Sequence, residues 1–209
     1  MKKEKYAIYI GLPVFLIFAV SVMMKAGWIV QFDAALQHVA RAIPNLTGLM
    51  LKLSLLAAPK VDLIWMLILA VILWSKHMQP MATSIVITLV SADAVGFIIK
   101  HIVQRARPVQ HLAIDDGFSF PSGHTLGMGV IVFWLILVLL PIVVKDQTKL
   151  FWIDLILIIW LVIVMCSRVY VFAHYPSDVC ASTAFAAFWV GLVAICLKKI
   201  VYQIWHKNI

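Results

Sequence analysis

Residues 167–178 read Ser-Arg-Val-Tyr-Val-Phe-Ala-His-Tyr-Pro-Ser-Asp, and they join two long apolar runs. Apolar runs do not explain an Arg, a His and an Asp at their junction. Arg168 carries a planar fork of donors that suits phosphate oxygens, and His174 can act as a nucleophile or proton carrier near neutral pH. Asp178 follows His174 by four residues, so a helical turn would put carboxylate and imidazole on one face. An ordinary polar loop outside the membrane is the alternative interpretation of this stretch alone.

The composition around this stretch is that of a membrane protein. The chain has 209 residues, of which 64% are hydrophobic and 12% charged, with a mean hydropathy of +1.04. Such values exclude an ordinary soluble domain, and several apolar runs approach the ~20 residues that cross a bilayer. We therefore expect an all-α, polytopic membrane protein with a single domain over residues 1–209.

The positive net charge of +8 does not indicate a nucleic-acid partner. Many lysines flank the apolar runs, and three of the four arginines, Arg105, Arg107 and Arg168, lie in polar stretches between them. This distribution fits membrane topology together with an anionic ligand.

The apolar runs predict a bundle of six transmembrane helices. The helices are expected over about residues 6–24, 61–74 with a start nearer 56, 81 to beyond 100, 121–144, 150–168 and 177–197. Residues 30–60 alternate between polar and apolar types, and Pro44 interrupts them. This pattern predicts an amphipathic segment at the membrane interface after the first helix, which two short helices would form. A plain connecting loop is the alternative.

Six spans place both termini on one side of the membrane. That side carries nine lysines, and the other side carries eight cations. Four of the eight, Lys100, Arg105, Arg107 and Arg168, belong to the polar clusters and have a separate chemical explanation. Nine against the remaining four favours cytoplasmic termini. We therefore expect a multi-pass protein of the cell membrane whose active site faces the extracytoplasmic side.

A second polar cluster ends the third helix. Lys100 and Arg107 are seven residues apart, which places both on one helix face if the helix continues to Pro108. Asp93 lies seven residues earlier on the same face, and we expect it to face the bundle interior and pair with Lys100. Arg105 is expected off this face, toward lipid headgroups. Snorkelling of charged side chains to headgroups is the alternative interpretation of the whole cluster.

A third cluster opens the fourth helix, where residues 118–125 read Phe-Ser-Phe-Pro-Ser-Gly-His-Thr. Pro121 and Ser122 are ordinary signals of helix initiation. Gly123 at a helix N-terminus also lets an anion approach backbone N–H groups, where the helix dipole favours negative charge. Ser122 adds a hydroxyl donor, and His124 would stand beside the anion. The small pair Gly123 and Gly127 would alternatively serve close helix packing.

The six-helix pattern places all three clusters on the same side of the membrane. Together they supply three cations, a helix N-terminus and two histidines. Such a set suits a dianionic phosphate, because the cations neutralise its charge without a metal and stabilise the transition state of phosphoryl transfer. The acids and histidines lack the spacing of zinc or magnesium ligands, and no Gly-rich nucleotide loop exists. We therefore expect no metal and no cofactor.

The three clusters resemble the three-part signature of the type 2 phosphatidic acid phosphatases. The matching motifs are Lys100-x6-Arg107-Pro108, Pro121-Ser122-Gly123-His124 and Ser167-Arg168-x5-His174-x3-Asp178. Their order and spacing match, and the helix pattern extends the similarity to most of the chain. The resemblance implies an integral membrane lipid phosphatase that needs no metal and shares its site design with vanadium haloperoxidases.

The resemblance also assigns roles to single residues. It implies that His174 is the nucleophile that forms a phosphohistidine, that Asp178 orients it, and that His124 protonates the leaving alkoxide and then activates water. The phosphate would be held by Lys100, Arg107, Ser122, Gly123 and Arg168. One departure follows Asp178: the family favours glycines early in the last helix, whereas this chain has the small residues Ala181 and Ser182.

The sequence leaves the substrate open among phosphatidylglycerophosphate, phosphatidic acid and undecaprenyl diphosphate. Selectivity among lipids depends on pocket shape and lateral openings, which no motif encodes. A lipid phosphotransferase on the same scaffold is the nearest alternative, since a phosphohistidine can pass its phosphate to a hydroxyl instead of water. A non-catalytic lipid-phosphate binder or transporter is a further alternative, and it would not need both histidines.

Overall fold

The structure is a computed structural model that describes residues 2–109, 112 and 116–207. The described residues form helices and connecting loops without strands, which confirms the all-α prediction. The elements in chain order are α1 (Lys2–Met23), α2 (Gly27–Arg41), α3 (Thr47–Leu56), α4 (Pro59–Ser75), α5 (Gln79–Val103), α6 (Gly123–Trp134), the π-helical turn η1 (Leu135–Leu139), α7 (Leu140–Val143), α8 (Gln147–Tyr170) and α9 (Pro176–Lys207).

Among the described residues, five helices are individually long and apolar enough to cross a membrane. These are α1, α5, the continuous run from α6 to α7, α8 and α9. Helices α3 and α4 pass the same test only together, and they are bent by 45° at a short break. Pro59 begins α4 after this break, because proline suits the first turn of a helix. The described residues thus supply five candidate spans, and the predicted six if α3 and α4 are counted as one.

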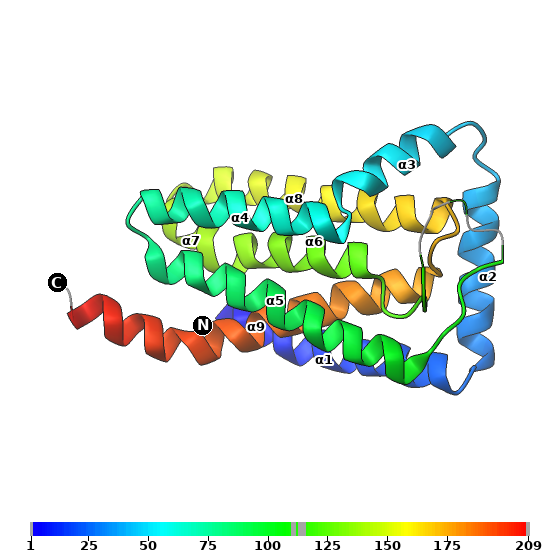
Figure 1. Ribbon diagram of the computed structural model, residues 1–209, viewed down its shortest axis with the longest axis horizontal. Coiled ribbons are helices and arrows are strands. Elements are labelled where there is room, and N and C mark those ends of the chain that lie inside the picture. Colours follow the sequence, from blue (N-terminus) through cyan, green and yellow to red (C-terminus); the bar gives the residue numbers. More distant parts are fainter. Residues whose placement is uncertain (1, 110–111, 113–115, 208–209) are drawn as a thin grey trace.

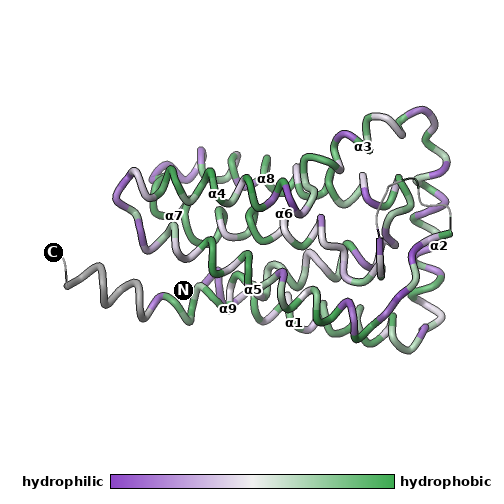
Figure 2. Tube along the Cα trace, in the orientation of Figure 1, coloured by the Kyte–Doolittle hydropathy of each residue, from purple (hydrophilic) through white to green (hydrophobic). Residues whose placement is uncertain are grey.

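Helix α2 crosses the end of the bundle that lies away from the chain termini (Figure 1). It buries Ile29 and Asp33 against the bundle while most of its other residues are exposed or half-buried. The predicted amphipathic segment is therefore present as a helix. Figure 2 shows hydrophobic residues along the length of the bundle, with hydrophilic residues gathered at the loops near α2 and at the turns of the opposite end.

Close packing of α1 on α9 joins the two ends of the chain. A Cβ added to Gly11 would lie 2.7 Å from the carbonyl oxygen of Ala184, and one added to Gly191 would lie 2.7 Å from that of Glu4. Small residues let two helix backbones approach this closely. Phe15 of α1 extends the contact by packing its ring against that of Phe185 of α9 in a tilted arrangement, with the ring centroids 5.0 Å apart.

The functional segments meet at the end of the bundle that α2 covers. Two loops converge there, one between α5 and α6 and the other between α8 and α9 (Figure 1). Both loops carry the polar clusters singled out in the sequence.

Candidate active site

Helix α5 extends beyond Lys100, as the sequence predicts, but it ends four residues before Arg107. Its last residue is Val103, and Gln104 takes a left-handed conformation with φ of 48°. Arg107 therefore lies in the following loop, and the prediction that Lys100 and Arg107 share one helix face is wrong. The two cations reach the site separately: Lys100 Nζ donates to the carbonyl of Phe118 at 3.0 Å, and Arg107 Nη1 donates to that of Ala173 at 2.8 Å.

His174 lies in the tight turn between α8 and α9. The carbonyl of Arg168 accepts hydrogen bonds from the backbone N–H groups of Ala173 and His174, at 3.1 and 3.3 Å. This turn directs the imidazole into the protein, where the residue is only 1% exposed. The burial of a titratable side chain at a loop is consistent with a functional site.

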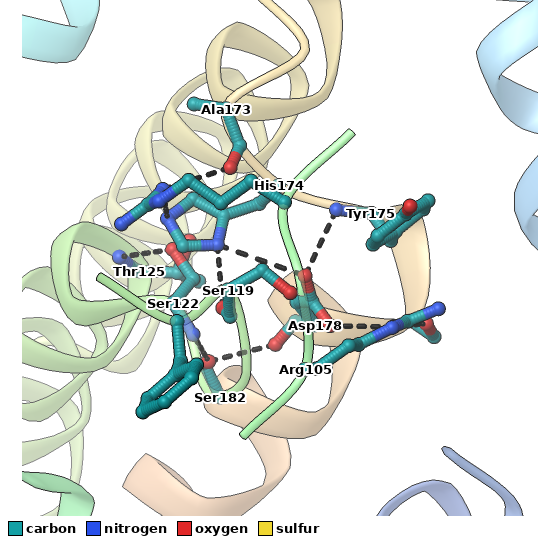
Figure 3. Close-up of polar contacts among 12 residues, drawn as sticks. Arg105, Ser119, Ser122, Thr125, Ala173, His174, Tyr175, Asp178 and Ser182 are labelled. Carbon is teal, nitrogen blue, oxygen red and sulfur yellow. Dashed lines mark hydrogen bonds and ion pairs between the residues drawn. The ribbon is translucent and has the colours of Figure 1, made fainter. Parts of the chain in front are cut away.

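The two ring nitrogens of His174 have different partners (Figure 3). Nδ1 lies 2.7 Å from the carbonyl oxygen of Ser119, which can only accept, so Nδ1 carries the proton. Nε2 lies 3.2 Å from Arg107 Nη1, which can only donate. The network therefore assigns the tautomer with a lone pair on Nε2, directed toward the guanidinium of Arg107.

Burial lowers the pKa of His174 to about 4. The carboxylate of Asp178 opposes this shift by favouring the imidazolium, whereas the cations Arg168 and Arg107 add to it. The imidazole is therefore neutral at pH 7 and keeps the lone pair that a nucleophile needs.

Asp178 lies in the first turn of α9, which begins at Pro176, and it is fully buried. His174 precedes this helix, so a turn rather than a shared helix face brings the two side chains together. Asp178 Oδ2 lies 3.7 Å from His174 Nδ1 and accepts a hydrogen bond from the N–H of Tyr175 at 2.9 Å. The carbonyl of Ser119 is thus the closer partner of Nδ1, and Asp178 acts from slightly further away.

The predicted position of Arg105 is wrong. Instead of facing headgroups, its guanidinium joins two buried carboxylates, with Nη1 at 2.6 Å from Asp178 Oδ1 and Nη2 at 2.6 Å from Asp33 Oδ2. The ring of Tyr175 covers the guanidinium at 3.9 Å. Asp33 belongs to α2 and is 72 residues away in the chain. No pattern in the sequence connects the two.

The start of α6 is fixed from two sides. Ser122 caps the helix by accepting a hydrogen bond from the N–H of Thr125 at 3.4 Å. Its own N–H donates to Ser182 Oγ at 2.8 Å, and Ser182 Oγ donates to the carbonyl of Asp178 at 2.7 Å. One of the two residues that depart from the family pattern therefore ties α6 to α9 at the site. Gly123 and the buried His124 form the first turn of α6.

The remaining predicted cation, Arg168, is buried in the last turn of α8. It donates from Nη1 to the hydroxyl of Ser54 in α3, so the bent pair also contributes to the site. The pairing of Asp93 with Lys100 stays a prediction. Asp93 is half-buried in α5, close enough to Asp62 of α4 for the two carboxyl groups to interact electrostatically.

The residues described here come from four helix ends. Arg107 and Asp178 lie close to the imidazole of His174, and the charge of Arg168 acts on it. Ser122, the N-cap of α6, connects to Asp178 through Ser182, and Gly123 and His124 follow it in the first turn of the helix. Within the part of the chain that the structure describes, no group of three or more His, Cys, Asp or Glu residues is arranged to hold a metal ion.

Comparison with known proteins finds a matching family model, a similar sequence and a similar fold. The model of the PAP2 superfamily matches residues 81–202. The chain is 27% identical to an undecaprenyl-diphosphatase of Sulfolobus acidocaldarius, over 94% of this chain and 93% of that protein. It is also similar to the crystal structure of a transmembrane PAP2-type phosphatidylglycerolphosphate phosphatase from Bacillus subtilis, with a TM-score of 0.81, 21% identity and coverage of 96% and 98% of the two chains.

Proposed function

Because the chain belongs to the PAP2 superfamily and is a membrane-bound lipid phosphatase, we propose that it hydrolyses a lipid phosphomonoester or diphosphate through a phosphohistidine on His174. The candidate substrates are undecaprenyl diphosphate, phosphatidylglycerophosphate and phosphatidic acid. We place undecaprenyl diphosphate first, because the sequence relative that spans almost the whole chain is named for it.

The proposal rests mainly on the tautomer of His174 and on the position of its Nε2 next to Arg107. Its Nδ1–H donates to Ser119, its Nε2 keeps a lone pair, and Arg107 Nη1 lies 3.2 Å from that nitrogen. A phosphate oxygen bound to Arg107 would bring phosphorus next to the lone pair of Nε2. Positioning of this kind is the main catalytic device in phosphoryl transfer.

The reaction then has two steps. In the first, Nε2 forms a bond to phosphorus while the bond between phosphorus and the leaving lipid oxygen breaks, and His124 donates a proton to that oxygen. In the second, His124 takes a proton from water, the water oxygen bonds to phosphorus, and the P–N bond breaks to release inorganic phosphate and free His174. Lys100, Arg107, Arg168 and the N-terminus of α6 with Ser122 and Gly123 would stabilise the charge on the phosphoryl oxygens.

We also propose that the reaction needs no metal and takes place on the extracytoplasmic side of the cell membrane. Lysine and arginine side chains supply the positive charge that a metal provides in other phosphatases. The excess of lysines at the opposite end of the bundle supports the orientation.

The test is phosphate release by the detergent-purified protein from the three candidate lipids, with EDTA present. We expect release by the wild type and loss of at least about 10³-fold in His174→Ala, since removal of a nucleophile leaves only the residual effect of binding. His77→Asn is the matched control: His77 is an exposed residue with φ of 57° in the turn between α4 and α5, a conformation that asparagine accepts.

Three results would contradict the proposal. Activity of His174→Ala near that of the wild type would exclude the nucleophile, and a loss with EDTA that added metal restores would exclude the metal-free site. A wild type that releases no phosphate but transfers it to an added acceptor lipid would favour the phosphotransferase.

A further inference from the structure

We propose that Arg105, fixed by Asp33 of the interfacial helix α2, is a positioning residue for Asp178 and His174, so that α2 forms part of the catalytic assembly. This inference rests on the proposed function. Neither Arg105 nor Asp33 belongs to the three motifs that carry the family resemblance.

Arg105 fixes the position of the Asp178 carboxylate. Oδ1 accepts from Arg105 Nη1 at 2.6 Å, and Oδ2 accepts from the N–H of Tyr175 at 2.9 Å. With both oxygens bound, the carboxylate plane is fixed, and Oδ2 stays 3.7 Å from His174 Nδ1. Without Arg105 only one oxygen would keep a partner, and a buried carboxylate would lose its counter-charge.

Asp33 in turn fixes the position of the Arg105 guanidinium. The guanidinium is planar and rigid, so its Nη2 bond to Asp33 Oδ2 at 2.6 Å fixes the direction of Nη1. Asp33 is itself buried and fixed by the start of α9, because Oδ1 accepts from the N–H of Ser177 and Oδ2 from its hydroxyl, each at 2.8 Å. Arg105 Nη1 also donates to that hydroxyl at 2.7 Å.

Arg105 also acts on the site through its charge. Burial lowers the pKa of Arg105, but the carboxylates of Asp178 and Asp33 outweigh burial and raise it, so the guanidinium stays charged. Its charge neutralises part of the field that Asp178 exerts on His174. The other charged groups that act on His174 are Arg168 at the end of α8 and Arg107 in the loop after α5.

A purely structural role for Arg105, as a tie between α2 and α9, makes a different prediction. Loss of a tie would lower stability or the fraction of active protein but would leave the ionisation of His174 unchanged. Loss of the proposed role would expose His174 to the full field of Asp178. That field favours the imidazolium, so the pKa of His174 would rise and the acid limb of the pH–rate profile would move to higher pH.

The experiment compares Arg105→Gln, Arg105→Lys and Asp33→Asn in the full-length, detergent-purified protein, with undecaprenyl diphosphate and phosphatidic acid in micelles as the probes. Arg41→Gln is the matched control, because Arg41 also lies on α2 and contacts the ring of Phe172 in the loop before His174, at 4.9 Å. Monodispersity and helical content are checked for each variant.

We expect Arg105→Gln to lower kcat roughly 100-fold with little change in KM, because the side chain positions other groups and does not touch the lipid. Its acid limb should move to higher pH. Arg105→Lys should recover part of the lost kcat, since an ammonium group restores the positive charge but not the planar guanidinium that donates to Asp178 and Asp33 at the same time. Asp33→Asn should lower kcat about 10-fold, and Arg41→Gln should stay within about threefold of the wild type.

A kcat of Arg105→Gln equal to that of Arg41→Gln would overturn the inference, and so would a large loss with an unshifted acid limb. Failure of the proposed function is a separate result. In that case the wild type would release no phosphate, or His174→Ala would be as active as the wild type, whatever Arg105 does.

Discussion

At the scale of single residues, His174 is a neutral side chain in a charged surrounding. Two cations and one carboxylate lie around it, and the cations together with burial outweigh the carboxylate, so that its pKa falls to about 4. A hydrogen bond to the carbonyl of Ser119 then decides which nitrogen carries the lone pair. Protonation state and tautomer both favour attack by Nε2.

The ionisation of His174 can be measured directly. In 15N-histidine-labelled protein without substrate, with His174→Gln as the assignment control, we expect one imidazole to titrate near pH 4 and to keep its proton on Nδ1. Because the folded pKa lies below the unfolded value of 6.5, the unfolded state binds more protons between these values. Stability should therefore fall as the pH drops from about 6.5 to about 4, by at most about 3 kcal/mol. A His174 that titrates near 6.5 would contradict the assignment.

The specific spacing of the three motifs singles out their residues in the sequence, but it does not predict the partners that these residues contact. The closest partner of His174 Nδ1 is a backbone carbonyl, that of Ser119, and every residue type offers one. Arg105 and Asp33 pair across 72 residues, and neither shows a pattern that distinguishes it from a surface charge. Residue type and spacing therefore suggest candidate catalytic groups, whereas the groups that position them become visible only in the structure.

At the scale of elements, hydropathy predicted the helices, and local conformation decided where they end. The sequence places the end of the third helix just before Pro108, the nearest helix-breaking signal. The structure ends α5 at Val103 because Gln104 adopts a left-handed conformation. Glutamine has no preference for this conformation, unlike glycine or asparagine. The early end turns Arg105 inward and frees Arg107 to reach His174.

Helices α4 and α6 also pack closely against each other near the site. Asp62 of α4 is 0% exposed, and in the described part of the chain neither carboxyl oxygen has a hydrogen-bond partner. A Cβ on Gly127 of α6 would lie 2.3 Å from Asp62 Oδ2. Gly127 therefore leaves room for the carboxyl group of Asp62, so that α4 and α6 fit together sterically at this point.

Replacement of Gly127 tests whether this glycine is needed to accommodate the Asp62 carboxyl group. Gly127→Ala should destabilise the protein by about 1–3 kcal/mol, because its methyl group overlaps Asp62 in a packed interior. Asp62→Ala should remove most of that cost in the double variant, which thermal unfolding in detergent would measure as a coupling between the sites. Gly48→Ala is the control: nothing lies within 4 Å of its added Cβ in α3, so it should be neutral or stabilising by up to about 1 kcal/mol. If the stability changes caused by Gly127→Ala and Asp62→Ala were additive, the two sites would not be coupled, and Gly127 would not be needed to accommodate Asp62.

At the scale of the whole molecule, the fold separates two polar ends by an apolar bundle. One end carries the site under α2, and the other carries the turns between α4 and α5 and between α7 and α8 (Figure 1). The lysines outside the site concentrate at the second end, so the positive-inside rule predicts that this end is cytoplasmic. Four of the eight cations at the first end belong to the proposed phosphate site and to the Asp33–Arg105–Asp178 network, so nine cations at the second end are compared with the remaining four.

The orientation can be tested with single cysteines in a background where Cys166, Cys180 and Cys196 are replaced by alanine. Val109, which is 98% exposed in the loop after α5, is changed to cysteine to report on the site end. Gln147, exposed at the start of α8, reports on the other end and leaves the lysines that set topology unchanged. In intact cells an impermeant maleimide should label Val109→Cys, and it should label Gln147→Cys only after permeabilisation. The reverse pattern would place the site in the cytoplasm, and the excess of lysines at the opposite end would then need an explanation other than topology.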